Sequence, residues 1–417
     1  MVELATLLLS IAVILITTRA VSWLFLRVEQ PPVVGEMIAG IMLGPSLLGW
    51  IAPDVSNALF PTESQALLEG LSVLGLVLFM FLVGMEHDPS LMRGRRRTAV
   101  LVSHASMTIP FALGTLLALF LYPRLGEQPA SFTQFALFIG ISVSITAFPV
   151  LARMLVDVGM VRTPVGVLAL VCASVNDLTG WLALAAVLPM MGVGRDPDDL
   201  PPWLSIPGSV LFALLMLTVG RRLLARLGTR FRSRGLTMGL LVTILLVAIL
   251  SAWTTEQLGV HPLFGAFVAG LAMPRDPGLF DALEVRLRDV TIALLLPLFF
   301  ALSGLRTRVG LIAGAQMWLY FALVLGVAIA GKFSGAALSA RAAGLRWREA
   351  ASLGVLVNTR GLIELVVLNI GLEAGIISPA LFAMLVLMAI VTTLMTMPLL
   401  SLLYPRGAAG REVAAPP

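Results

Sequence analysis

The chain has 417 residues, of which 59% are hydrophobic and 12% are charged. Soluble domains carry about 25% charged residues, so this composition excludes a soluble enzyme, a disordered chain and a collagen-like fibre. The single cysteine, Cys172, excludes an internal disulfide bond. The net charge of +5 is weak evidence for nucleic acid, because arginines gather on one side of membrane proteins for topological reasons. We therefore expect a membrane protein with no nucleic-acid partner.

Long apolar stretches follow one another along the whole chain. A transmembrane helix needs about 20 mostly apolar residues to cross the hydrocarbon core of a bilayer. This length predicts thirteen spans, at residues 4–26, 33–52, 67–85, 98–121, 132–155, 164–190, 206–225, 236–253, 258–273, 290–304, 310–340, 350–372 and 379–403. We expect an all-α polytopic membrane protein, with a transmembrane domain at residues 1–405 and a short cytoplasmic tail at residues 406–417.

The positions of the cations test this topology. If the N-terminus lies outside, 21 of the 28 Lys and Arg residues fall on the cytoplasmic side and four fall outside. Cytoplasmic loops are enriched in Lys and Arg, and one span more or fewer would scramble this asymmetry. The sequence thus predicts an odd number of helices in the cell (plasma or inner) membrane, with the N-terminus outside and the C-terminus in the cytoplasm.

Two parts of the sequence repeat each other. Residues 35–40 and 265–270 both follow the pattern G-x-x-x-A-G, and the next spans end similarly, with FMFLVG at 79–84 and PLFFALSG at 297–304. The copies are seven spans apart, an odd number, so they would cross the membrane in opposite directions. Inverted repeats are typical of secondary transporters, although small residues at this spacing also serve ordinary helix packing.

Five ionisable residues lie away from the ends of the expected spans: Glu36, Asp177, Lys332, Arg360 and Glu364. A charge at the bilayer centre costs roughly 2.5–3.5 kcal/mol on insertion scales, so each one requires a reason. Asp177, beside Asn176, is the single charged residue of its span. Because desolvation favours a neutral carboxyl group, this residue can hold a proton, or release it and hold a cation. The alternative is a structural aspartate that bonds to the backbone or pairs with Lys332.

Two expected spans contain polar residues followed by a helix breaker. The first carries Ser142, Ser144 and Thr146 before Pro149, and the second carries Asn358, Thr359 and Arg360 before Gly361. Proline removes a helix hydrogen bond, and nearby hydroxyls can satisfy the backbone groups that become free. The pattern predicts two discontinuous helices whose broken ends form an ion site. An ordinary kinked helix is the alternative.

Lys332 is the single lysine beside 27 arginines. Lysine can lose its charge when it is buried, so it can respond to its surroundings. We expect Lys332 either to bond exposed carbonyls at the broken helices or to pair with Asp177. Arg360 and Glu364 are four residues apart, a spacing that favours a charge-neutral structural pair.

The sequence lacks the short motifs of several enzyme classes. It contains no Walker motif, dinucleotide fingerprint or nucleophile elbow, and its three histidines show no metal-binding spacing. We expect a transporter rather than an enzyme, with no cofactor and no metal ion other than a transported monovalent cation at Asp177.

Seven segments together resemble the cation:proton antiporter-2 family: VGEMIAGIMLGPSLLG, FLVGMEHD, SITAFPVLARML, SVNDLTGWLALA, HPLFGAFVAGL, PLFFALSGLRT and NTRGLIELVVLNIG. They occur in the family's order over roughly residues 30–400 and are most similar to plant CHX-type exchangers, and more distantly similar to Kef-type systems. The resemblance implies exchange of a monovalent cation (K⁺ or Na⁺) for H⁺ by alternating access. It also implies an inverted-repeat fold of thirteen helices that assembles as a homodimer.

The resemblance implies roles for the residues already named. Asp177 would bind the cation and the proton, with Asn176 and Thr146 beside it, and Lys332 would steady the crossing of the broken helices. The crossing and its support would come from Ser144, Pro149, Asn358, Thr359, Arg360 and Glu364. An Asn–Asp pair usually accompanies electroneutral exchange in related antiporters. A core from roughly residues 98–190 and 310–403 would move against a dimerisation panel built from the early helices of each repeat.

The sequence departs from Kef-type relatives in one respect. It ends soon after the last expected helix, so we expect no regulation by a nucleotide-binding domain within the chain. Regulation by a separate subunit is the alternative. Two other functions stay open as well: a ligand-gated K⁺ efflux channel, and an exporter of an organic solute or ionophore on the same scaffold.

Overall fold

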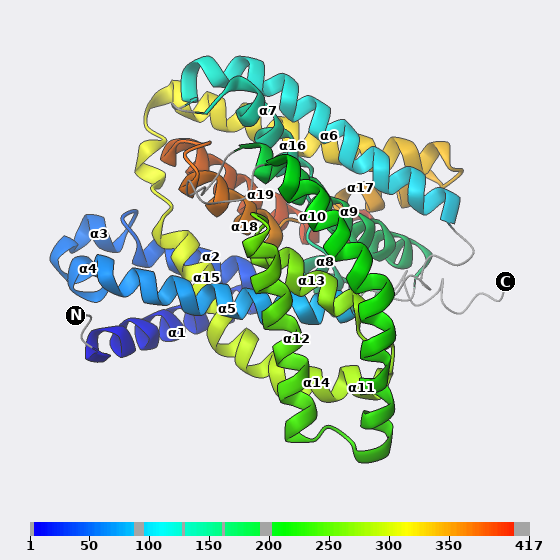
Figure 1. Ribbon diagram of the computed structural model, residues 1–417. Helices are drawn as coiled ribbons and strands as arrows, with labels where there is room; N and C mark the ends of the chain where they lie inside the picture. The colour runs from blue at the N-terminus through cyan, green and yellow to red at the C-terminus, as the bar shows by residue number, and fades with distance from the viewer. Residues whose placement is uncertain (1–3, 87–95, 127–129, 161–162, 192–201, 404–417) are drawn as a thin grey trace. The chain divides into compact units, whose positions relative to one another are not determined.

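The computed structural model describes residues 4–86, 96–126, 130–160, 163–191 and 202–403, and these residues form helices with no β-strand among them (Figure 1). The α-helices are α1 (Leu4–Arg27), α2 (Pro32–Leu43), α3 (Leu48–Ile51), α4 (Pro53–Leu59), α5 (Thr62–Glu86), α6 (Arg96–Leu125), α7 (Phe132–Ser144), α8 (Phe148–Asp157), α9 (Pro164–Met191), α10 (Pro202–Leu215), α11 (Arg221–Arg234), α12 (Met238–Gln257), α13 (Pro262–Ala272), α14 (Pro277–Val290), α15 (Leu296–Leu305), α16 (Gly314–Ala342), α17 (Trp347–Leu356), α18 (Leu362–Glu373) and α19 (Pro379–Leu403). Two π-helical turns, η2 (Met216–Gly220) and η3 (Thr291–Leu295), join α10 to α11 and α14 to α15, and the 3-10 turn η4 (Val309–Leu311) precedes α16. The expected all-α fold is confirmed.

Eight segments of the described residues are long and apolar enough to cross a membrane. They are Leu4–Arg27, Pro32–Ile51, Ser64–Met85, Thr98–Leu125, Met238–Gln257, Gly278–Leu311, Gly314–Ala342 and Pro379–Leu403. Shorter apolar helices occur at Phe132–Ser144, Pro164–Asn176 and Pro262–Ala272. A span that is broken in the middle consists of two short helices, and a search for long helices does not detect it. The number of thirteen spans therefore stays a prediction.

The chain divides into two compact units. The first unit consists of residues 1–15, 58–88 and 185–302, and within it α13 packs against α5 and α12. The second unit consists of residues 16–57, 89–184 and 303–417. Within it α16 runs along α6 and also contacts α17 and α19 (Figure 1). The expected division into a moving core and a dimerisation panel stays a prediction.

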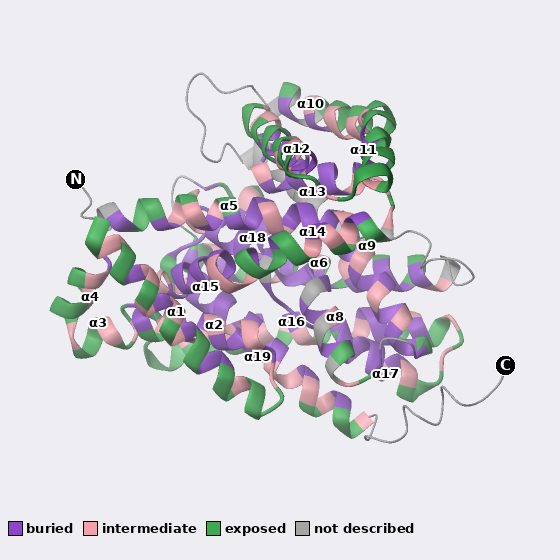
Figure 2. Cartoon of the chain, turned by 90° about the horizontal axis from the view of Figure 1, so that it is seen from below, coloured by how far each residue is buried: buried purple, intermediate pink, exposed green. Residues whose placement is uncertain are grey.

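The helices of the first unit differ from one another in how far they are exposed. Figure 2 shows broad exposed bands on α10, α11 and α12 of the first unit, whereas α13 beside them is mostly buried. Leu211, Leu246 and Leu250 are among the exposed apolar side chains of these helices. In a membrane protein such side chains face lipid tails, which are as apolar as the side chains themselves.

The repeated glycines form two equivalent close contacts. In the first unit, a Cβ added to Gly84 of α5 would lie 2.3 Å from the Phe267 carbonyl oxygen and 3.0 Å from Gly270 Cα in α13. In the second unit, a Cβ added to Gly304 of α15 would lie 2.5 Å from the Gly40 carbonyl carbon in α2. Each contact joins the second helix of one sequence copy to the first helix of the other. The sequence repeat therefore recurs as a repeated packing geometry, in which glycine allows two backbones to approach.

We predict that Gly304→Ala lowers the melting temperature of the protein, because the new methyl group collides with the backbone of Gly40. Forcing extra atoms into a packed contact typically costs about 1–3 kcal/mol. Gly326→Ala is the matched control: an added Cβ there meets no atom within 4 Å, and alanine is favoured over glycine in a helix. Thermal unfolding of the purified protein in detergent, followed by tryptophan fluorescence, measures both variants. Equal melting temperatures for Gly304→Ala and the wild type would contradict the prediction.

Candidate functional site

Two helices are interrupted in the middle of the predicted spans. α7 ends at Ser144 and α8 begins at Phe148, and the three residues between them are buried. α17 ends at Leu356 and α18 begins at Leu362. Each break leaves backbone N–H and C=O groups without partners inside the helix. Since these groups are buried, other parts of the protein must satisfy them. The prediction of two discontinuous helices is confirmed.

The two connecting segments contact each other directly. The N–H of Ala147 donates to the carbonyl oxygen of Thr359 at 3.0 Å, and the hydroxyl of Thr146 donates to the carbonyl oxygen of Val357 at 2.9 Å. Gly361 permits this approach, because a Cβ at that position would lie 3.0 Å from the Ala147 Cβ. The broken helices therefore cross, and each one satisfies backbone groups at the break of the other.

Arg360 occupies the broken end of α7. Its Nη1 and Nη2 atoms donate to the carbonyl oxygens of Ser142 and Val143 at 2.9 and 2.6 Å. A cation is favourable there because the last carbonyls of a helix carry partial negative charge. Thr393 of α19 fixes the Arg360 backbone by accepting from its N–H and donating to its carbonyl oxygen, both at 3.0 Å. The Glu364 Oε2 atom lies 3.6 Å from Nη1, so the fully buried arginine also has a carboxylate partner.

The Thr146 hydroxyl joins several helices. It accepts hydrogen bonds from Lys332 Nζ in α16 and from Asn176 Nδ2 in α9, the latter at 3.2 Å, while it donates to Val357. A hydroxyl has one donor and two acceptor positions, so all of its capacity is used. The Asn176 amide also donates to Ser106 Oγ in α6 at 3.1 Å. These bonds fix the orientation of the Asn176 side chain at the crossing of the broken helices.

Asp177 follows Asn176 in α9, and its side chain lies outside the described residues. Around the crossing, several buried oxygens accept no hydrogen bond from the described part of the chain: Asn176 Oδ1, Asn358 Oδ1 and both carboxylate oxygens of Glu364. Carbonyl and carboxylate oxygens at broken helices are the ligands that coordinate monovalent cations in channels and transporters. The arrangement therefore combines oxygen ligands with buried positive charges.

The other predicted site residues lie at the same breaks and bond locally. The Ser144 hydroxyl donates to the carbonyl oxygen of Ile141 at 2.9 Å, within its own helix. The Thr359 hydroxyl donates to the carbonyl oxygen of Leu356 at 2.7 Å and closes the end of α17. Pro149 lies in the first turn of α8, where a missing N–H costs nothing, and its side chain is outside the described residues.

Two residues of this network were not predicted from the sequence. Ser106 and Thr393 belong to long helices that have no break and no charged neighbour. Serine and threonine in such helices commonly bond their own backbone, as Ser103 does with the carbonyl oxygen of Ala99. Residue type alone therefore gave no signal, and the partners become visible only when α6 and α19 are placed beside the crossing.

Crossed discontinuous helices with buried ionisable residues define a class of protein, the secondary transporters that bind their substrate near the bilayer midplane. The chain belongs to the sodium/hydrogen exchanger family, whose transmembrane model matches residues 10–402. The expected membership in the monovalent cation/proton exchangers is thus confirmed.

The chain is similar in sequence to several named antiporters. It is 43% identical to the Na⁺/H⁺ antiporter NhaS4 of Synechocystis over 401 residues, which cover 96% of this chain and 97% of that protein. It is 39% identical to Cation/H⁺ antiporter 17 of Arabidopsis thaliana and 36% identical to K⁺/H⁺ antiporter 1 of Saccharomyces cerevisiae. The matches cover 96% and 91% of this chain, but 48% and 44% of those longer proteins.

The fold is similar to a solved structure. The sodium proton antiporter MjNhaP1 from Methanocaldococcus jannaschii aligns with a TM-score of 0.65 over 97% of this chain and 98% of that chain. The sequence identity is 14%, so the likeness concerns the fold alone.

We predict that Thr146→Val lowers the melting temperature well below that of Thr146→Ser. Valine keeps the volume but removes the oxygen that Lys332 and Asn176 share, and each buried polar group that loses its partner costs about 1–3 kcal/mol. Serine retains the hydroxyl and serves as the matched control. Thermal unfolding in detergent measures both variants, and indistinguishable melting temperatures would show that the shared hydroxyl does not stabilise the crossing.

Proposed function

We propose that this chain is a secondary antiporter that exchanges a monovalent cation, K⁺ or Na⁺, for H⁺ across the membrane by alternating access. One observation carries the proposal: the Asn176 amide is fixed by Ser106 and Thr146 at the crossing of the two broken helices, immediately before Asp177 in the chain. The names of the relatives, which specify Na⁺/H⁺ and K⁺/H⁺ antiporters, support the proposal.

In this mechanism Asp177 is the residue that carries either a proton or a cation. The two ligands compete because one carboxylate offers the same oxygens to both. A bound cation needs further oxygen ligands in place of its hydration shell, and Asn176 Oδ1 and Asn358 Oδ1, which accept no hydrogen bond from the described residues, are candidates. Competition at one group couples the two fluxes, since the site returns across the membrane only when it is occupied.

Lys332 and Arg360 support the crossing rather than travel with the ion. Arg360 complements the carbonyl end of α7, and Lys332 holds the hydroxyl of Thr146. If both cations keep their charge through the cycle, one carboxylate exchanges one positive charge for another. The exchange is therefore electroneutral in this proposal.

The proposal also includes the assembly of the protein and its orientation in the membrane. A homodimer would hold the panel helices still while a core from residues 98–190 and 310–403 carries Asp177 from one side to the other. The asymmetry of the arginines supports a cell-membrane (plasma or inner) location, with the N-terminus outside and the C-terminus in the cytoplasm.

We predict that Asp177→Asn abolishes exchange, because an amide neither releases a proton nor attracts a cation. The measurement is the cation-dependent pH change inside proteoliposomes that contain the purified protein, with K⁺, Na⁺ and Li⁺ tested in turn. Glu349→Gln is the matched control, since Glu349 pairs with Arg346 at the start of α17, outside the buried crossing. Wild-type exchange by Asp177→Asn would refute the assigned role. Failure of the wild type to move a cation uphill under an imposed pH gradient would favour a channel.

We predict that the cation concentration for half-maximal exchange rises as the pH falls. Protons then occupy Asp177 more often, so more cation is needed to displace them. For simple competition at one group, the increase approaches about tenfold per pH unit on the acidic side of its titration. Initial rates over a series of cation concentrations and pH values test this, with the maximal rate as the internal control. A half-maximal concentration that is independent of pH, with only the maximal rate changing, would exclude competition at one site.

A further inference from the structure

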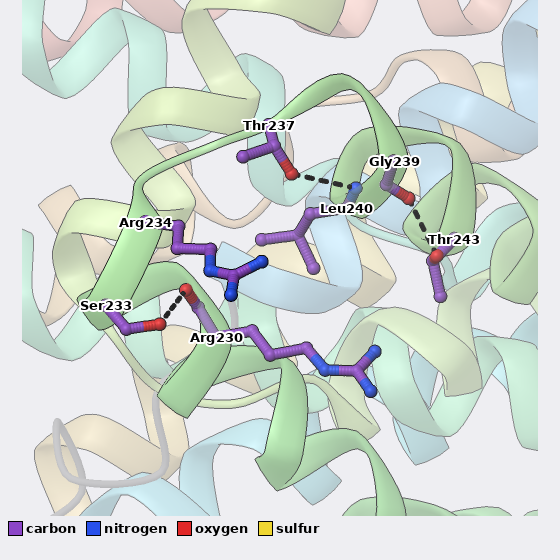
Figure 3. A pocket seen from close by; sticks show the side chains of 7 residues that line it. All are labelled: Arg230, Ser233, Arg234, Thr237, Gly239, Leu240 and Thr243. Atoms are coloured by element: carbon purple, nitrogen blue, oxygen red, sulfur yellow. Dashed lines mark hydrogen bonds between the residues drawn. The ribbon is translucent and has the colours of Figure 1, made fainter.

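A cavity of about 620 Å³ lies in the first unit, at the turn between α11 and α12 (Figure 3). Its lining residues come from the end of one helix and the start of the next: Arg230, Ser233, Arg234, Thr237, Gly239, Leu240 and Thr243. Gly235, with φ of +66°, ends α11 and reverses the chain. The hydroxyl of Thr237 then accepts from the N–H of Leu240 and caps the start of α12. The walls of the cavity are therefore fixed by two well-defined helix ends.

The cavity is electropositive. α11 contains six arginines and no acidic residue among its 14 residues. Arg222, Arg226, Arg230 and Arg234 recur every four residues and so follow one face of the helix. The last two reach into the cavity (Figure 3), and neither forms an ion pair with any residue that the structure describes. Arg232, by contrast, is paired with Asp276 at 3.0 Å.

The start of α12 adds backbone donors to the same space. The first N–H groups of a helix have no partner inside the helix and carry partial positive charge. The hydroxyls of Ser233 and Thr243 already donate to the carbonyl oxygens of Arg230 and Gly239. No carboxylate is found among the described residues that line the cavity. Two guanidinium groups and a helix start thus face a space suited to an anion rather than a cation.

An apolar surface begins beside the cavity. Met238, Val242 and Leu246 are 69%, 46% and 50% exposed, and their spacing of four residues places them in a stripe along α12. α12 is one of the helices long and apolar enough to cross a membrane. An occupant that satisfies both surfaces has an anionic head and apolar chains.

We propose that this cavity binds the phosphate of an anionic phospholipid, whose acyl chains lie along the stripe of Met238, Val242 and Leu246. Arginine presents paired N–H donors that match phosphate oxygens, and its charge is permanent. The predicted topology places the turn at the cytoplasmic surface, where basic segments next to a span meet anionic lipids. The proposal concerns a lipid site in the first unit and stands independently of the exchange reaction.

The test compares two double variants of the full chain. R230Q/R234Q removes both guanidinium groups from the cavity, whereas R221Q/R222Q removes the same charge from the start of α11, outside the cavity lining. Binding of dioleoyl phosphatidylglycerol and of dioleoyl phosphatidylcholine to the detergent-purified protein is measured by native mass spectrometry and by the shift in melting temperature. We expect the wild type to prefer phosphatidylglycerol. Loss of the two guanidinium groups is expected to weaken phosphatidylglycerol binding about tenfold or more in R230Q/R234Q, and less than about twofold in the control.

Several results would overturn the proposal. Equal loss of phosphatidylglycerol binding in both double variants would indicate general attraction to a basic helix, and equal binding of the two lipids would exclude headgroup recognition. Stabilisation by inorganic phosphate or glycerol phosphate equal to that by phosphatidylglycerol would assign the cavity to a soluble anion. Because Arg230 and Arg234 are exposed, R230Q/R234Q and the wild type should have the same melting temperature in the absence of lipid. If they differ, R230K/R234K keeps the charge and should retain more phosphatidylglycerol binding than R230Q/R234Q.

Discussion

The hydroxyl of Thr146 is shared by Lys332, Asn176 and the carbonyl of Val357, and the rest of the candidate site depends on this arrangement. A break in a helix at membrane depth releases backbone groups where no water can reach them, and each such group is costly unless the protein supplies a partner. The chain meets this constraint by crossing two breaks, so that one segment satisfies the other. The same contacts fix the side chain of Asn176, the residue that precedes Asp177 in α9.

The two buried cations follow from the same constraint. Arg360 serves the carbonyl end of α7, and Lys332 serves the hydroxyl at the crossing, so each charge is matched to a group that the breaks expose. A chain with 12% charged residues retains them because neutral side chains offer neither the number of donors nor the charge that a helix end favours. In the proposed exchange these fixed charges leave Asp177 as the group whose charge changes. In this proposal Arg360 and Lys332 stabilise the crossing, and Asp177 carries the transported ion.

The features of the fold and site that could be predicted from the sequence are those set by residues close together in the chain. Proline and glycine act on their own helix, so the breaks beside Pro149 and Gly361 were predictable, as were the apolar spans and the closely packed glycines of the repeat. Arg360 was predicted from its spacing to pair with Glu364, and the structure adds the carbonyls of Ser142 and Val143 as nearer partners. These lie more than 200 residues away in sequence. Spacing along one helix carries no information about such contacts.

The sequence by itself determined that this protein is a helical membrane protein of the exchanger family, because composition, hydrophobic length and motif order are properties of the chain alone. Only the tertiary structure decided which donors meet which acceptors at the crossing. Ser106 and Thr393 have no distinguishing neighbours in the sequence, yet they fix Asn176 and the Arg360 backbone. The structure also shows that two of the six arginines of α11, Arg230 and Arg234, line a cavity at the start of α12, the next helix in the chain. The donors and acceptors at the crossing required the tertiary structure because a hydrogen bond needs its atoms within about 3 Å, and only packing between helices distant in sequence sets that distance there.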